Sequence, residues 1–117
     1  MGELPDFNRE RIAVLFGNDL TICKQVLDIL KDDLPSHLDQ LSESIGEQDS
    51  RQIYKTAHTL KGTLANVGAD RGSSLAQRMV LASQENNFEY CRKLYESLVE
   101  TTETFLAEFQ ELAFENT

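Results

Sequence analysis

The sequence predicts an all-α protein, an antiparallel four-helix bundle with an additional short N-terminal helix. Composition favours helices, since 40% of the 117 residues are hydrophobic while glycine occurs six times, proline twice and tryptophan not at all. Four long segments repeat apolar residues at the helical period, and few segments alternate as strands do. The short turns between them favour antiparallel neighbours. The length suits one domain over residues 1–117.

The first helix is short and is expected to act as a lid on the bundle. Asp6 or Asn8 can cap its first turn, and Gly17 is placed to end it. Its apolar residues are Ile12, Leu15 and Phe16. Asn18 or Asp19 can then cap the second helix.

The second helix is long and closes at Gly46. Its apolar positions follow the helical period: Ile22, Val26, Ile29, Leu30, Leu34, Leu38, Leu41 and Ile45. Pro35 is expected to kink or split this helix, because proline removes a backbone donor and clashes with the preceding turn. Asp49 or Ser50 starts the third helix.

The third helix runs to Val67 and stops at Gly68, as at a glycine C-cap. Residues 71 to about 85 form the fourth helix, with Leu75, Met79 and Ala82 inward. Asn86 and Asn87 provide a turn and the cap of the last helix. The apolar side of that helix carries Cys91, Leu94, Tyr95, Leu98, Thr102, Phe105, Phe109 and Leu112.

The third helix carries the most informative residues of the chain. Its core face is formed by Ile53, Ala57, Leu60, Leu64 and Val67. His58, Lys61, Gly62 and Ala65 collect on the opposite face, so His58 points to solvent. Glycine within a helix costs about 1 kcal/mol relative to alanine, so Gly62 needs a compensating reason. Close approach of a partner is such a reason, and Lys61 can place a positive charge beside an anion held there.

This His-x-x-Lys-Gly pattern resembles the signature of histidine-containing phosphotransfer (HPt) domains, which serve multistep phosphorelays. The likeness covers about residues 50–85 and includes Thr63, Ala65 and the helix exit Asn66-Val67-Gly68-Ala69. The resemblance implies the four-helix fold, and it implies that His58 carries a phosphoryl group between the aspartates of response-regulator receiver domains. A neutral imidazole is a competent nucleophile because one ring nitrogen keeps a free lone pair.

The resemblance also assigns the acidic cluster, its Mg²⁺ and the phosphorylated aspartate to the receiver partner, so no cofactor is expected on this chain. Phosphoryl transfer depends mostly on in-line positioning and charge neutralisation. No nucleotide-binding motif occurs, which argues against ATP-dependent kinase activity of its own. The chain would be a carrier rather than a complete enzyme.

One position departs from part of the family. In chemotaxis-type kinases the next helix brings a Leu/Met-Glu pair whose glutamate bonds the imidazole, whereas the matching pair here is Met79-Val80. Val80 cannot accept a proton, which fits a relay module better. Gln77 is the best remaining polar neighbour for His58, and Gln84 is a weaker one.

The partner-binding patch is expected around Ala65 and an exposed edge of Leu64, with Gln84 nearby and a polar rim. Arg71 and Arg78 are interpreted as solvated side chains that can meet a partner's acidic rim.

Composition excludes several other functions. A net charge of −9 argues against nucleic acid or an anionic membrane surface as partner. Cys23 and Cys91 lie on apolar helix faces without Cys-x-x-Cys spacing, which indicates buried thiols in a reducing compartment. His37 lacks neighbours at metal-ligand spacing, and no metal site is expected. Three acidic residues at helix ends, Glu43, Glu47 and Asp49, are interpreted as solvated.

The sequence shows neither a leader nor an apolar stretch long enough to cross a bilayer, so a cytoplasmic location is expected. The chain is compatible with a free carrier and with the cytoplasmic domain of a membrane-bound hybrid sensor histidine kinase. A non-catalytic helical interaction module, with His58 incidental, is the alternative. A metal-binding or ligand-binding bundle is disfavoured because inward Glu-x-x-His pairs are lacking.

Overall fold

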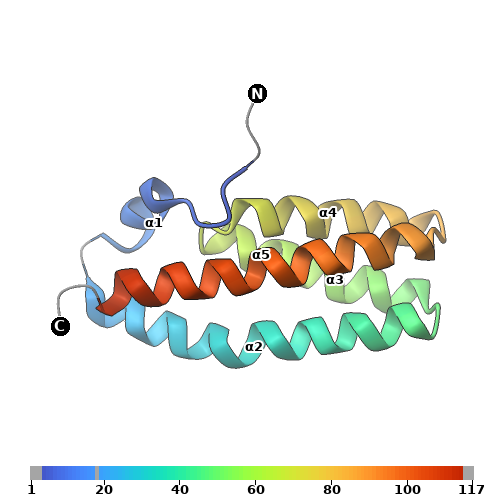
Figure 1. The fold of residues 1–117 in the computed structure, drawn as a ribbon, viewed down its shortest axis with the longest axis horizontal. Helices are drawn as coiled ribbons and strands as arrows, with labels where there is room; N and C mark the ends of the chain where they lie inside the picture. Colours follow the sequence, from blue (N-terminus) through green and yellow to red (C-terminus); the bar gives the residue numbers. More distant parts are fainter. Residues whose placement is uncertain (1–3, 18, 115–117) are drawn as a thin grey trace.

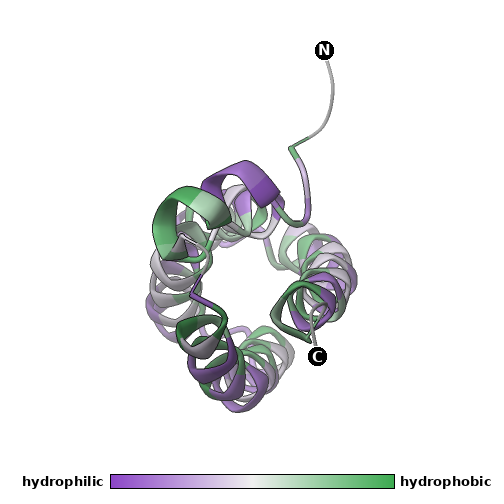
Figure 2. Cartoon of the chain, turned by 90° about the vertical axis from the view of Figure 1, so that its left-hand side faces the viewer, coloured by the Kyte–Doolittle hydropathy of each residue, from purple (hydrophilic) through white to green (hydrophobic). Residues whose placement is uncertain are grey.

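A computed structural model describes residues 4–17 and 19–114, and within these ranges the chain is helical with no strand. The helices are α1 (Arg9–Phe16), α2 (Leu20–Gly46), α3 (Ser50–Asn66), α4 (Asp70–Gln84) and α5 (Phe88–Phe114). Helices α2 to α5 run antiparallel along the bundle, and α1 lies across one end (Figure 1). Around the bundle, α3 packs between α2 and α4, and α5 packs between α4 and α2 (Figure 2). The predicted fold class is confirmed.

Side-chain caps fix where several helices begin. Four of them are aspartate or asparagine side chains at predicted positions. Asn8 accepts from Arg11 N, Asp19 from Ile22 N and Asp49 from Gln52 N, each at 3.1 Å, and Asn87 accepts from Tyr90 N (3.2 Å) at the start of α5. Asn18, the other candidate cap of α2, lies outside the described residues. Helix α3 ends one residue earlier than predicted, and Gly68 then takes the left-handed conformation at φ 78°.

Helix α2 continues through Pro35, so of the two predicted effects, a kink or a split, the split is wrong. Pro35 is exposed, while Leu34 and Leu38 on either side are buried in the core. Core packing of these neighbours holds both halves of α2 in one helix, although proline supplies no backbone donor.

The core follows the predicted helical faces with exceptions near the α1 end. Phe105 and Phe109 are fully buried, as are most of the leucines at core positions. The exposed fractions of Leu15, Ile22 and Ile29 are 46%, 42% and 60%. These apolar residues lie at the edges of their stripes, where the described helices do not cover them.

Helix α1 is joined to the turn between α3 and α4. The backbone N–H of Asn8 donates to the Gly68 carbonyl (3.1 Å). Phe7, just before α1, packs its ring against Phe105 and Phe109, with centroid distances of 5.7 and 5.9 Å. The N-terminal segment is therefore part of the core, and it covers the bundle end as a lid.

Candidate functional site

Helix α3 presents a buried face and a solvent face, as its sequence predicts. The five core positions are all buried: Ile53, Ala57, Leu60, Leu64 and Val67. On the other side His58 and Gly62 are exposed, and Lys61 and Ala65 are partly exposed. His58 lies near the middle of a 17-residue helix, so its backbone is held by the helical hydrogen bonds on both sides.

The imidazole of His58 lies beside the ring of Tyr54, one turn earlier on α3. The two ring centroids are 6.0 Å apart and the planes differ by 9°, an offset parallel arrangement. Within the described part of the chain, neither ring nitrogen of His58 makes a hydrogen bond. The nitrogens are thus free to react or to accept a partner's proton.

Gly62 leaves open the side of His58 that faces the C-terminal end of α3. A Cβ atom placed on Gly62 would meet no heavy atom within 4 Å apart from its own helix and chain neighbours. Packing therefore does not require glycine here, although glycine is a poor helix former. The neighbouring Lys61 is anchored to α4 by its backbone, because Ser73 Oγ donates to the Lys61 carbonyl (3.0 Å).

The outer face of α3 thus combines an exposed histidine with an open helical glycine one turn later. The model of the Hpt domain family matches residues 25–113, which is most of the chain. The chain belongs to the Hpt domain family. Hpt domains take part in histidine phosphotransfer within phosphorelays of two-component signalling, and they interact with receiver domains. No curated protein and no solved structure matches the chain.

Gln77 of α4 lies opposite the turn of α3 that carries His58, but no hydrogen bond joins the two side chains among the described residues. Ser73 lies against Lys61, and the helices are antiparallel, so Gln77 comes opposite the turn that precedes Lys61. Gln77 Oε1 is buried and has no hydrogen-bond partner. Val80, the predicted counterpart of the glutamate in chemotaxis-type kinases, is buried and apolar. The interaction between Gln77 and His58 stays a prediction.

Leu64 does not contribute to the surface. Its exposed fraction is 0%, so the prediction of an exposed edge is wrong. The reason lies in α4, where Gly72 allows close approach and a Cβ there would be 3.1 Å from Leu64 Cδ1. Ala65 is partly exposed, as the prediction requires.

Arg11 of α1 is a contact of this surface that the sequence analysis missed. Its Nη2 donates to the Ala65 carbonyl (2.7 Å), and its Nη1 pairs with Asp70 of α4. Asn8 also donates to Asp70 (2.7 Å). Ala65 is 54 positions and Asp70 is 59 positions after Arg11 in the sequence. A local sequence pattern cannot predict contacts between residues so far apart. Tyr54 was missed as well, although its spacing of four residues from His58 was visible.

Gln84 is exposed and lines a shallow depression at the ends of α3 and α4. Tyr54 lines the same depression, together with Ser50, Arg51, Ser83 and Asn86. The depression therefore adjoins His58 through the Tyr54 ring.

Among the described residues, His37 and the two cysteines show no features of a second site. His37 Nδ1 lies 2.9 Å from the Asp33 carbonyl on the same helix. Cys23 and Cys91 are unpaired and buried, and burial raises the pKa of both thiols. Among the described residues, no cluster of His, Cys, Asp or Glu could hold a metal ion. Nor is any helix of residues 4–17 and 19–114 long and apolar enough to cross a membrane.

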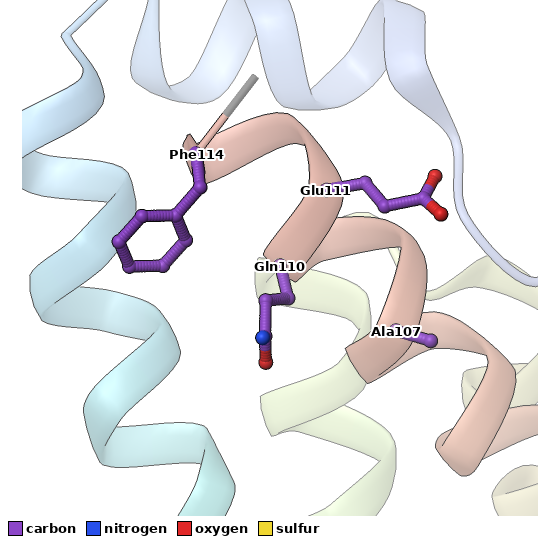
Figure 3. A pocket seen from close by; sticks show the side chains of 4 residues that line it. All are labelled: Ala107, Gln110, Glu111 and Phe114. Carbon is purple, nitrogen blue, oxygen red and sulfur yellow. The ribbon is translucent and has the colours of Figure 1, made fainter. Parts of the chain in front are cut away.

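An open hollow lies elsewhere, on the last turns of α5. Ala107, Gln110, Glu111 and Phe114 line it, and Figure 3 shows Phe114 directed toward α2 while Glu111 points to the other side. Lys24 of α2 lies 4.8 Å from the Phe114 ring centroid. Its lining contains no histidine, serine or cysteine, and it lies on a different helix from His58.

Proposed function

We propose that this Hpt domain is the carrier of a multistep phosphorelay and that His58 is its phosphoacceptor. The observation that supports the proposal most strongly is the exposed His58 beside an open Gly62 in a chain of the Hpt family. In this function, the domain takes a phosphoryl group from the aspartate of one receiver domain and passes it to the aspartate of another.

The transfer exchanges one bond for another. The lone pair of a ring nitrogen of His58 attacks phosphorus, an N–P bond forms, and the P–O bond to the donor aspartate breaks with its electron pair leaving on the carboxylate. The other ring nitrogen keeps its proton. The second transfer is the reverse reaction with a new aspartate, so the carrier needs no oxidant, reductant or nucleotide.

Two neighbours would assist this step. Lys61 supplies positive charge near the transferred phosphoryl group, and Gln77 Oε1, buried without a partner, would accept a hydrogen bond from the N–H of the non-reacting imidazole nitrogen. Mg²⁺ belongs to the acidic site of the receiver. The Hpt domain itself acts as carrier and substrate, without kinase activity.

The docking surface is proposed around Gly62, with Ala65 on one side and Gln84 on the other. A small patch of this kind suits a partner that must be released after each transfer. The unpaired thiols suit a reducing compartment, and we place the domain in the cytoplasm, as a free protein or as part of a hybrid sensor histidine kinase.

The competing function is a non-catalytic interaction module in which His58 is incidental. Both functions use the same fold and the same exposed helix, and they differ only in chemistry at His58. A stable complex without covalent labelling would favour the module.

The test is transfer of labelled phosphate from a phosphorylated receiver domain. Wild type should acquire a label that acid removes and base does not, and His58→Gln should acquire none while keeping its helical circular dichroism, because an exposed side chain contributes little to stability. His37→Gln is the matched control, since His37 is the other of the two histidines, and it should be labelled normally. Labelling of His58→Gln, or an acid-stable label on wild type, would overturn the proposal.

A further inference from the structure

Among the described residues, Tyr54 is the one whose aromatic ring stacks beside the imidazole of His58. The rings are 6.0 Å apart between centroids and nearly parallel, at 9°. Tyr54 is 38% exposed, so this ring lies on the surface of α3 and is not a core side chain. Its hydroxyl makes no hydrogen bond to any described residue. Fold stability therefore gives no strong reason for tyrosine at this position.

Helix geometry explains why Tyr54 affects His58 in particular. Side chains on a helix lean toward its N-terminus, so the residue four positions earlier lies under the side chain of His58. Lys61 and Gly62 lie on the other side, where Gly62 leaves open space. The imidazole thus has a ring on its N-terminal side and open surface on its C-terminal side.

We propose that Tyr54 is a positioning residue for phosphotransfer, and this rests on the function proposed above for His58. Its ring limits the imidazole to orientations in which the reactive nitrogen faces the open surface over Gly62. An exposed histidine without such a neighbour is free to sample several χ1 and χ2 rotamers, and only some of them are in line with a docked phosphoryl group. The Tyr54 ring reduces the number of imidazole rotamers before the partner binds, so less conformational entropy is lost when the phosphoryl group docks.

The experiment compares Tyr54→Ala, Tyr54→Leu and Tyr54→Phe with wild type. Tyr90→Ala is the matched control, because Tyr90 has nearly the same exposed fraction, 39%, but lies on α5. The rate of transfer at saturating receiver should fall about two- to tenfold in Tyr54→Ala, the range that corresponds to an aromatic pair. Leucine, which keeps apolar bulk without a ring, should also be slow. Phenylalanine should restore the rate, and Tyr90→Ala should not change it.

A second readout requires no partner. In proton NMR spectra the imidazole resonances of His58 should carry a ring-current shift that is kept in Tyr54→Phe and lost in Tyr54→Ala and Tyr54→Leu. Unchanged imidazole shifts in Tyr54→Ala, or a wild-type transfer rate in that variant, would overturn the positioning role.

The outcomes separate this inference from the proposed function. If wild type accepts no phosphoryl group, the carrier function fails whatever the NMR spectra show. If wild type is labelled and Tyr54→Ala changes only the receiver concentration needed for half-maximal rate, Tyr54 contacts the partner, and the positioning role is wrong while the carrier function stands.

Discussion

Gly62 on α3 and Gly72 on α4 lie on neighbouring helices, but Gly62 borders open surface whereas Gly72 borders packed side chains. A Cβ on Gly72 would be 3.1 Å from Leu64 Cδ1 and 3.6 Å from Thr101 Cγ2, so glycine there lets α4 approach α3 and α5 closely. A Cβ on Gly62 would meet nothing within 4 Å. One glycine serves packing inside the bundle, and the other leaves the surface beside His58 open.

The difference shows that the two faces of α3 are under different physical constraints. On the inner face, volume must match, because buried side chains lose dispersion contacts or clash when it changes. On the outer face, substitutions are expected to change stability little and phosphotransfer strongly. Substitutions on either face can test this separation.

The largest stability effect is expected at Leu64, on the inner face. Leu64→Ala should lower the free energy of unfolding by about 2–5 kcal/mol, because it leaves a cavity beneath Gly72. Urea denaturation measures this loss. The partly exposed neighbour Ala65 is the control, and Ala65→Ser should stay within about 0.5 kcal/mol of wild type. If Leu64→Ala unfolds at the same urea concentration as wild type, the close packing of Leu64 against α4 is wrong.

Overpacking at Gly72 should have the next largest effect. Gly72→Leu forces a large side chain against Leu64 and Thr101 and should cost about 1–3 kcal/mol of stability. Thermal unfolding measures it. If Gly72→Leu is as stable as wild type, the close approach of α4 to α3 is not a constraint, and the contrast with Gly62 disappears.

A smaller effect, on rate alone, is expected at Lys61. Lys61→Ala should slow phosphotransfer by about two- to fivefold, because a partly exposed charge stabilises a neighbouring anion only modestly. The difference should shrink as ionic strength rises, since salt screens the charge. Transfer kinetics at low and high salt measure it, and the melting temperature should not move. Equal rates in the two proteins at low salt would remove Lys61 from the site.

Helical periodicity was sufficient to predict the fold, because each long helix has an apolar face that only a bundle buries. It was not sufficient at the edges of those faces. Ile22 and Ile29 fit the period of α2 but are exposed, since coverage at an edge depends on where neighbouring helices end. At Pro35 the local sequence favours a break in the helix, but core packing on both sides keeps α2 continuous.

At the candidate site, the sequence placed His58, Lys61, Gly62 and Ala65 on one face correctly. Leu64 was misjudged, because its burial depends on Gly72 in the next helix. The bond from Arg11 to the Ala65 carbonyl joins residues 54 positions apart, which no local spacing reveals. Whether Gln77 bonds His58 depends on side-chain rotamers, and these follow from packing rather than from residue type.

The most direct test of the difference between the two faces is the pair of measurements on Gly62→Gln. Glutamine is the better helix former, so the free energy of unfolding should rise by several tenths of a kcal/mol while phosphotransfer from a receiver slows at least about tenfold. Gly46→Gln is the control, because Gly46 is also helical and open yet lies at the end of α2, and it should leave transfer unchanged. A Gly62→Gln protein that melts several degrees lower and transfers phosphate at the wild-type rate would contradict the assignment of this face to docking.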